Sequence, residues 1–187
     1  MDEFGLHQIS TFINHDRAFI YEPRGFQSVY EMNDAIVERW NRVVDIDDDV
    51  FLLGDIMLNN NEGGIKLLQS LKGRIHIVLG NHDSSAREAL YRECYTVVEV
   101  VVAARIRYNG YHFYLSHYPT FTGNLEKESL KQMAICLCGH THDKRSFYQD
   151  IPFIYNVACD AHNCTPVLLD DIIIECNEKV KECISKL

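Results

Sequence analysis

Short apolar runs and amphipathic segments alternate along the first half of the chain. Runs rich in branched or aromatic residues at 6–12, 50–53 and 74–79 predict buried strands. Between the first two, apolar residues recur at spacings of three and four from residue 28 to residue 44, and Ser28 stands three residues before Glu31, as in a helix capping box. We therefore predict a capped amphipathic helix there, with further helices at 64–71, 85–93 and 126–133.

Strand-like runs dominate the second half. They lie at 97–102, 104–108, 111–116, 135–138, 153–158 and 166–174, and Asn109 with Gly110 is a typical two-residue hairpin turn between two of them. A short helical tail is expected at 177–187. Helix–strand alternation followed by strands favours a layered α/β sandwich over a purely doubly wound sheet. Because no linker rich in Pro, Gly or Ser divides the chain, we expect residues 1–187 to form a single domain.

Composition narrows the class of protein. A chain of 187 residues, of which 47% are hydrophobic, can bury a core without disulfides. The formal net charge of -9 argues against strong non-specific binding to nucleic acid or to an anionic membrane surface. The cysteines are odd in number, no apolar run approaches the roughly 18 residues of a membrane span, and the N-terminus lacks a signal-peptide pattern. We therefore expect a reduced, cytoplasmic protein with no membrane segment, and the sequence leaves its oligomeric state open.

Four of the predicted strands are followed at once by residues whose side chains can bind metals, and three of these clusters begin with glycine. The clusters are Gly54 and Asp55, then Gly80 with Asn81, His82 and Asp83, then His117, and finally Gly139 with His140, Thr141 and His142. Sites in open α/β sheets lie at such strand ends, and a leading glycine allows close approach of the backbone to a ligand. Carboxylate, amide oxygen and imidazole together suit hard to borderline divalent cations such as Mn²⁺, Fe or Zn²⁺, and two such cations can lower the pKa of a water and orient a phosphate.

One histidine of the set is not needed as a ligand. His82 is predicted to protonate the leaving oxygen of a phosphate ester, while Asp83 orients its ring. Arg17 and Arg24 are candidate phosphate contacts, although a surface ion pair is the more typical role.

The same clusters resemble the signature blocks of the calcineurin-like metallophosphoesterases. GD at 54–55, GNHD at 80–83, SHYP at 116–119 and GHTH at 139–142 carry the resemblance, and RGF at 24–26, EMN at 31–33 and RWN at 39–41 are similar to a bacterial and phage subgroup of small phosphoesterases. The resemblance implies a layered α/β/β/α sandwich that hydrolyses a phosphodiester or phosphomonoester through metal-activated water, with a phosphate-ester small molecule or a nucleotide as substrate. It also implies the ligand roles: Asp55 bridges two metals, Asn81, His117 and His140 bind one of them, His142 binds the other, and His82 is the acid.

The sequence departs from that family at the first block, an Asp-x-His at the end of the first strand. Residues 9–16 read ISTFINHD, with hydroxyls and Phe12 where the carboxylate and imidazole belong, while His15 resembles the histidine that follows the block and is a candidate substrate contact. The metal of His142 is then weakly held by Asp55, His142 and His15, or is absent, or the whole site is catalytically impaired. We expect unequal occupancy, with the other metal bound more strongly. The alternatives are a degenerate relative that binds a nucleotide or phosphate ligand at one metal site without efficient hydrolysis, and a structural relative without metal.

Overall fold

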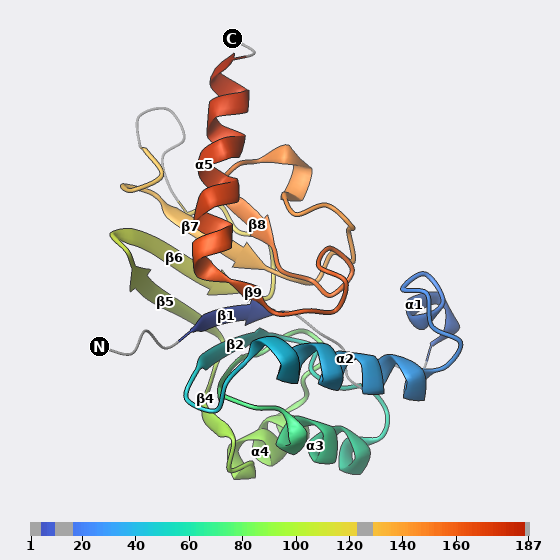
Figure 1. The fold of residues 1–187 in the computed structure, drawn as a ribbon. Coiled ribbons are helices and arrows are strands. Elements are labelled where there is room, and N and C mark those ends of the chain that lie inside the picture. Colours follow the sequence, from blue (N-terminus) through green and yellow to red (C-terminus); the bar gives the residue numbers. More distant parts are fainter. Residues whose placement is uncertain (1–4, 10–16, 123–128, 186–187) are drawn as a thin grey trace.

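Two β-sheets lie between helical layers in the computed structural model, which describes residues 5–9, 17–122 and 129–185 (Figure 1). The first sheet has the strand order β4 (Val97–Val101), β3 (Arg74–Val78), β2 (Asp49–Leu53), β1 (Leu6–Ile9) and β9 (Val167–Leu168). The second has the order β5 (Ala103–Tyr108), β6 (Tyr111–Ser116), β7 (Ala134–Cys138) and β8 (Ile154–Asn156). Strands β1 to β4 are parallel, as are β6 to β8, whereas β9 and β5 pair antiparallel with their neighbours.

Helices cover the outer faces of both sheets. On the first sheet lie α2 (Val29–Val43), α3 (Asn61–Ser70) and α4 (Ser85–Glu93), and α5 (Leu169–Ser185) packs on the second (Figure 1). Strand β2 shows the layering directly, because Val50 and Leu52 join the core beneath α2 to α4 while Phe51 and Leu53 join the core shared with the second sheet and α5. The predicted α/β/β/α sandwich is confirmed. Two shorter helices, α1 (Ala18–Tyr21) and the 3₁₀ turn η1 (Tyr148–Asp150), were not predicted.

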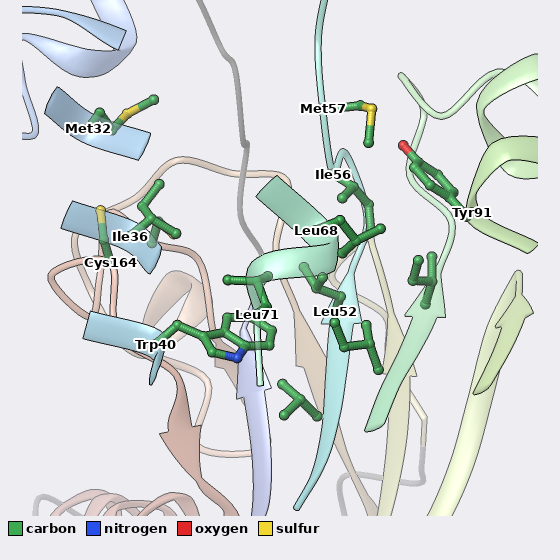
Figure 2. Close-up of a cluster of buried hydrophobic side chains, with 14 of the residues drawn as sticks. Met32, Ile36, Trp40, Leu52, Ile56, Met57, Leu68, Leu71, Tyr91 and Cys164 are labelled. Carbon is green, nitrogen blue, oxygen red and sulfur yellow. The ribbon is translucent and has the colours of Figure 1, made fainter. Parts of the chain in front are cut away.

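The predicted capping of α2 is also found. The Ser28 hydroxyl accepts a hydrogen bond from the Glu31 N–H at 3.2 Å, and the Glu31 carboxylate accepts one from the N–H of Gln27 at 2.7 Å. On the buried face of α2, Trp40 is fully enclosed, and its indole N–H donates to the Lys72 carbonyl at 2.9 Å. Figure 2 shows part of this core, which includes Met32, Ile36 and Trp40 of α2, Leu52 of β2, Leu68 of α3 and Leu71 directly after α3. The core under the first sheet therefore depends on a helix whose start the sequence specifies.

The hairpin between β5 and β6 agrees with its sequence signal. Asn109 and Gly110 both have positive φ, 48° and 80°, as a type I′ turn requires. Tyr108 pairs with Tyr111 directly beside the turn.

The C-terminal third contains the main correction. The strand predicted at 166–174 is wrong, since only Val167–Leu168 is a strand and α5 begins at Leu169; the predicted tail helix is its second half, described to Ser185. Leu169, Ile172 and Cys176 are buried at spacings of three and four, and Asp170 and Asp171 occupy the first turn, where acidic side chains are favourable. A dense apolar run is compatible both with the alternation of a strand and with the three-to-four spacing of a helix, and here it forms a helix.

Smaller differences affect element boundaries. The strand predicted at 153–158 spans only Ile154–Asn156, and α3 begins three residues before the predicted start because the Asn60 side chain caps it by accepting from the Gly63 N–H at 2.9 Å. In the helix predicted at 126–133, residues 129–133 instead form a turn, with the N–H groups of Gln132 and Met133 bonded to the Ser129 carbonyl. Residues 126–128, and 10–12 of the first predicted strand, lie outside the described ranges. Among the described helices, none has both the length and the apolar character of a transmembrane segment.

Candidate metal centre

The loops that follow β2, β3, β6 and β7 meet at the carboxyl ends of their strands. The Nε2 atom of His117 lies 3.1 Å from Asp55 Oδ2, 3.0 Å from Asn81 Oδ1 and 3.1 Å from His140 Nδ1. One ligand atom from each of Asp55, His117 and His140 lies within 4.8 Å of the others. We term Asp55, Asn81, His117 and His140 the His117 cluster. They come together from four separate segments of the chain, and the family resemblance implies that they bind the stronger metal.

Two glycines permit this approach. Gly54 has φ +82°, and a Cβ atom there would lie 2.5 Å from His117 Nδ1. A Cβ atom at Gly80 would lie 2.5 Å from the backbone nitrogen of Asp55. No side chain fits in either gap, so the predicted role of these glycines in close backbone approach has a direct steric basis. Asp55 and His140 themselves have φ of 52° and 64°, a backbone conformation that is uncommon for residues other than glycine.

Asp83 joins two of these loops. Its carboxylate accepts hydrogen bonds from the backbone N–H of Asp55 at 2.7 Å, of Ile56 at 3.2 Å and of Gly80 at 2.9 Å, and from the hydroxyl of Tyr91 at 2.7 Å. Tyr91 is fully buried on α4, so the helical core is connected directly to the loops of the centre. The role predicted for Asp83, orientation of the His82 ring, stays a prediction; its hydrogen bonds shape the backbone instead.

Burial and charge pairing set the protonation of Asp55 and His117. Burial alone would raise the pKa of Asp55, but hydrogen bonds from His117 and from the His82 N–H hold it below the usual range. Burial would lower the pKa of His117, whereas Asp55 and the Leu53 carbonyl raise it. His117 Nδ1 lies 2.9 Å from the Leu53 carbonyl oxygen, so its N–H donates there and Nε2 is directed at the cluster. At His140, burial and the neighbouring His117 lower the pKa, which favours the neutral, ligating form of that imidazole.

His142 is held differently. Its Nδ1 lies 3.1 Å from Oδ2 of Asp160, and Asp160 receives two hydrogen bonds from Arg24, at 3.0 Å from Nε and 2.8 Å from the terminal nitrogen. The side chains of Arg24 and Asp160 are only 4% and 8% exposed, so this pair is buried rather than the surface pair expected for Arg24. Burial would raise the pKa of Asp160, but His142 and Arg24 keep it well below the usual range. We term His142 and Asp160 the His142 pair.

Asp160 was missed in the sequence because nothing in its local pattern marks it. Its partners lie 18 and 136 residues away along the chain. The only available signal was its place three residues after Val157, at the end of a strand-like run.

A cleft of about 420 Å³ borders the centre. Its lining residues are Arg17, Phe19, Ile20, Asp55, Leu58, Asn59, His82, His140 and His142. His82 therefore lines the same cleft as three of the proposed ligands, and its predicted role near the substrate stays a prediction. His15, together with Ser10 and Phe12 of the divergent block, lies outside the described residues.

The donor set of the His117 cluster fits a divalent cation. One carboxylate, one amide oxygen and two imidazoles converge, with a backbone carbonyl fixing the tautomer of one imidazole. On the other side, the proposed ligands within the described ranges are Asp55 and His142, and Nδ1 of His142 lies 3.1 Å from Oδ2 of Asp160.

Comparisons with known proteins found a matching family model and several similar proteins. A family model described as calcineurin-like phosphoesterase superfamily domain matches residues 30–157. The uncharacterized protein MJ1445 of Methanocaldococcus jannaschii is 33% identical over 181 residues, which cover 91% of this chain and 89% of that protein. The gene 66 protein of Mycobacterium phage L5 is 30% identical over 155 residues, covering 70% and 73%. A crystal structure of the Aquifex aeolicus protein of unknown function AQ665 shares the fold, with a TM-score of 0.70 at 21% identity over 91% of this chain and 98% of that one.

Proposed function

Because the chain belongs to the calcineurin-like phosphoesterase superfamily, we propose that it is a metal-dependent hydrolase of phosphate esters. The proposed reaction is hydrolysis of a phosphodiester or phosphomonoester, and diesters are slightly favoured by analogy with small members of the family. The observation that carries the proposal is the convergence of the His117 cluster beside a cleft that also contains His82.

The proposed ligands of the stronger cation are Asp55, Asn81, His117 and His140, and a second, weaker cation would use Asp55 and His142. Manganese, iron and zinc suit these donors. A bound cation supplies Lewis-acid polarisation of the phosphate and lowers the pKa of a water molecule. The chain contributes a site that is already assembled, since Oδ1 of Asp55 is held by the His82 N–H at 2.7 Å while Oδ2 faces His117.

His82 is proposed as the general acid. Its backbone is fixed on both sides, because its N–H donates to Asp55 and its carbonyl accepts from Arg87 at 2.6 Å. His82 is also among the residues that line the cleft. An imidazole that carries a proton can give it to the leaving alcohol oxygen. Asp83 supports this role by fastening the loop that carries His82 to the loop that carries Asp55.

Release of nitrophenol tests the reaction. The protein is loaded with Mn²⁺, its metal content is measured, and bis(4-nitrophenyl) phosphate and 4-nitrophenyl phosphate are supplied. We expect turnover that a chelator removes, and a loss of about 100-fold or more in His82→Ala with unchanged metal content. His112→Ala, in β6 and outside the cleft lining, is the control. A metal-loaded protein that turns over neither ester would refute the proposal.

A second candidate function is binding of a nucleotide or phosphate ligand without efficient hydrolysis. It is favoured by the sparse ligand set around His142 and by the absence of an Asp-x-His block from residues 9–16. The double substitution Ser10→Asp with Phe12→His tests it. A large gain in hydrolysis over the parent chain supports an impaired site, whereas an active parent that gains nothing supports the enzyme.

A further inference from the structure

Three rings are in mutual contact at the candidate metal centre. The imidazoles of His117 and His140 have their centroids 5.0 Å apart, with an angle of 72° between the ring planes. The phenol ring of Tyr118 lies 5.1 Å from the His117 ring at 74° and 4.8 Å from the His140 ring at 63°. These values are typical of the edge-to-face arrangement that aromatic rings prefer. Tyr118 therefore contacts two proposed ligands of the stronger cation at once.

The two imidazoles differ in how the nitrogen that faces away from the other ring is held. In His117 this atom is Nδ1, which lies 2.9 Å from the Leu53 carbonyl oxygen, and the side chain is 1% exposed. His140 is exposed, and its Nδ1 is the atom that lies 3.1 Å from Nε2 of His117. Among the described residues, none forms a hydrogen bond with Nε2 of His140. Because a carbonyl or carboxylate usually fixes the second nitrogen of a ligating imidazole, the His140 ring needs another contact to fix its orientation.

We propose that Tyr118 is a positioning residue of the metal centre, and that its ring fixes the orientation of the His140 imidazole and thereby sets the affinity for the stronger cation. The proposal rests on the proposed function, in which the His117 cluster holds that cation. A ring packed against the imidazole restricts its rotation before the cation binds, so that less conformational entropy is lost on binding. Tyr118 thus takes the place of the polar partner that His117 has and His140 lacks among the described residues.

The backbone of Tyr118 is anchored, whereas its side chain contributes little to the core. The Tyr118 N–H donates to the Ser116 hydroxyl at 3.3 Å, and its carbonyl accepts from the Thr120 hydroxyl at 3.0 Å. The residue is 47% exposed and belongs to neither of the two buried core clusters of the described chain. Its ring contacts with described residues are those with the two imidazoles. Loss of the ring should therefore affect the metal centre more than the stability of the fold.

Calorimetric titration of the metal-free protein with Mn²⁺ tests the proposal without turnover. We expect Tyr118→Leu and Tyr118→Met, which lack a ring, to bind the tight cation about 10–100-fold more weakly than the parent. Tyr118→Phe keeps the ring and should bind it within about twofold of the parent affinity. Phe121→Leu is the matched control and should leave the affinity unchanged, because Phe121 is 59% exposed and its ring contacts Phe153, at 6.2 Å between centroids, instead of an imidazole.

Two further measurements separate positioning of a ligand from other roles. Thermal unfolding of the metal-free Leu and Met variants should resemble that of the parent, because the ring lies outside the core clusters of the described residues. When Mn²⁺ is raised above the weakened dissociation constant, nitrophenyl ester hydrolysis by Tyr118→Leu should recover to within about threefold of the parent, since the bound cation then supplies the same chemistry.

The inference is overturned if the Leu and Met variants bind Mn²⁺ as tightly as the parent, or if Tyr118→Phe loses as much affinity as Tyr118→Leu. A matching loss of thermal stability in the metal-free variants would make the role of Tyr118 structural, and turnover that stays lost at saturating Mn²⁺ would instead indicate contact with the substrate. Failure of the proposed function looks different, because the parent would then bind Mn²⁺ tightly but hydrolyse neither nitrophenyl ester.

Discussion

The His117 cluster and the His142 pair lie at the same cleft but are built in different ways. In the cluster, donor atoms from three other strand ends lie about 3 Å from Nε2 of His117, and His117 and Asp55 are almost fully buried. In the pair, a single partly exposed imidazole is positioned by a buried carboxylate that depends on Arg24. Ligands that are already assembled bind a cation without reorganisation, whereas a single oriented imidazole can form only one coordination bond. The comparison predicts one strongly bound cation and, at most, one weaker cation.

Loss of a cluster ligand should have the largest effect. His140→Ala removes an imidazole from the set that surrounds Nε2 of His117, so we expect loss of the tightly bound cation and a fall of about 100-fold or more in ester hydrolysis. Metal analysis after dialysis and the nitrophenol assay measure both. His142→Ala is the comparison, and it should retain the tight equivalent. Two equally tight cations in the parent chain, or equal losses in the two variants, would remove the distinction between the sides.

Replacing Gly54 and Gly25 by alanine should separate the effect of a steric clash from the effect of backbone strain on stability. Gly54 and Gly25 both have strongly positive φ, +82° and +88°, but a Cβ atom would collide with His117 at Gly54 and meets nothing within 4 Å at Gly25. We expect Gly25→Ala to cost about 1 kcal/mol of unfolding free energy and Gly54→Ala roughly 1–3 kcal/mol more.

Urea denaturation followed by circular dichroism measures both glycine variants. Gly54→Ala should also weaken the tight cation, because the added methyl group displaces His117. Similar stabilities and metal affinities in the two variants would show that the close approach of Gly54 to His117 is not required for folding or metal binding.

The carboxylate of the His142 pair should affect the weaker cation selectively. Asp160→Asn leaves His142 in place but removes the charge that orients it, and we expect the second cation to bind about 10–100-fold more weakly while the tight one is unchanged. Because Arg24 then loses its buried counter-charge, a fall in unfolding free energy is expected as well.

Isothermal titration with Mn²⁺ separates the two classes of cation. Asp143→Asn is the matched control, since it removes the same charge beside His142 from a carboxylate paired with the exposed Arg145. A second-cation affinity that falls equally in both variants would point to general electrostatics rather than to orientation.

The smallest effect on stability and metal affinity is expected from loss of the hydrogen bond between Tyr91 and Asp83. Tyr91→Phe deletes a hydroxyl that donates to Asp83 at 2.7 Å, which should cost about 1 kcal/mol of unfolding free energy and lower affinity for the tight cation by less than about tenfold. Thermal unfolding with and without Mn²⁺ measures both quantities. Tyr95→Phe, whose hydroxyl donates to the Gln69 carbonyl on the surface, serves as control. A larger effect at Tyr95 would contradict a link between α4 and the centre.

Local signals were sufficient where one element or one loop carries the information. The Ser28 cap and the hairpin at Asn109 and Gly110 act over a few residues, and each is found in the structure. The first half of α5 was mistaken for a strand because an apolar run of that length satisfies either period until its packing partners are known.

The chain by itself determined which donor atoms are available and in what order they follow the strands. Parallel strands bring their carboxyl ends to one edge of a sheet, which applies to Asp55 and Asn81 after β2 and β3 and to His117 and His140 after β6 and β7. The assignment of these four residues to one metal came from the resemblance to the family. Only the tertiary structure decided that Asp83 holds loops together, that Arg24 and Asp160 are a buried pair behind His142, and that Phe19 lines the cleft. These contacts join segments up to 136 residues apart, and their energies come from burial and complementary charge, which no periodicity along the chain records.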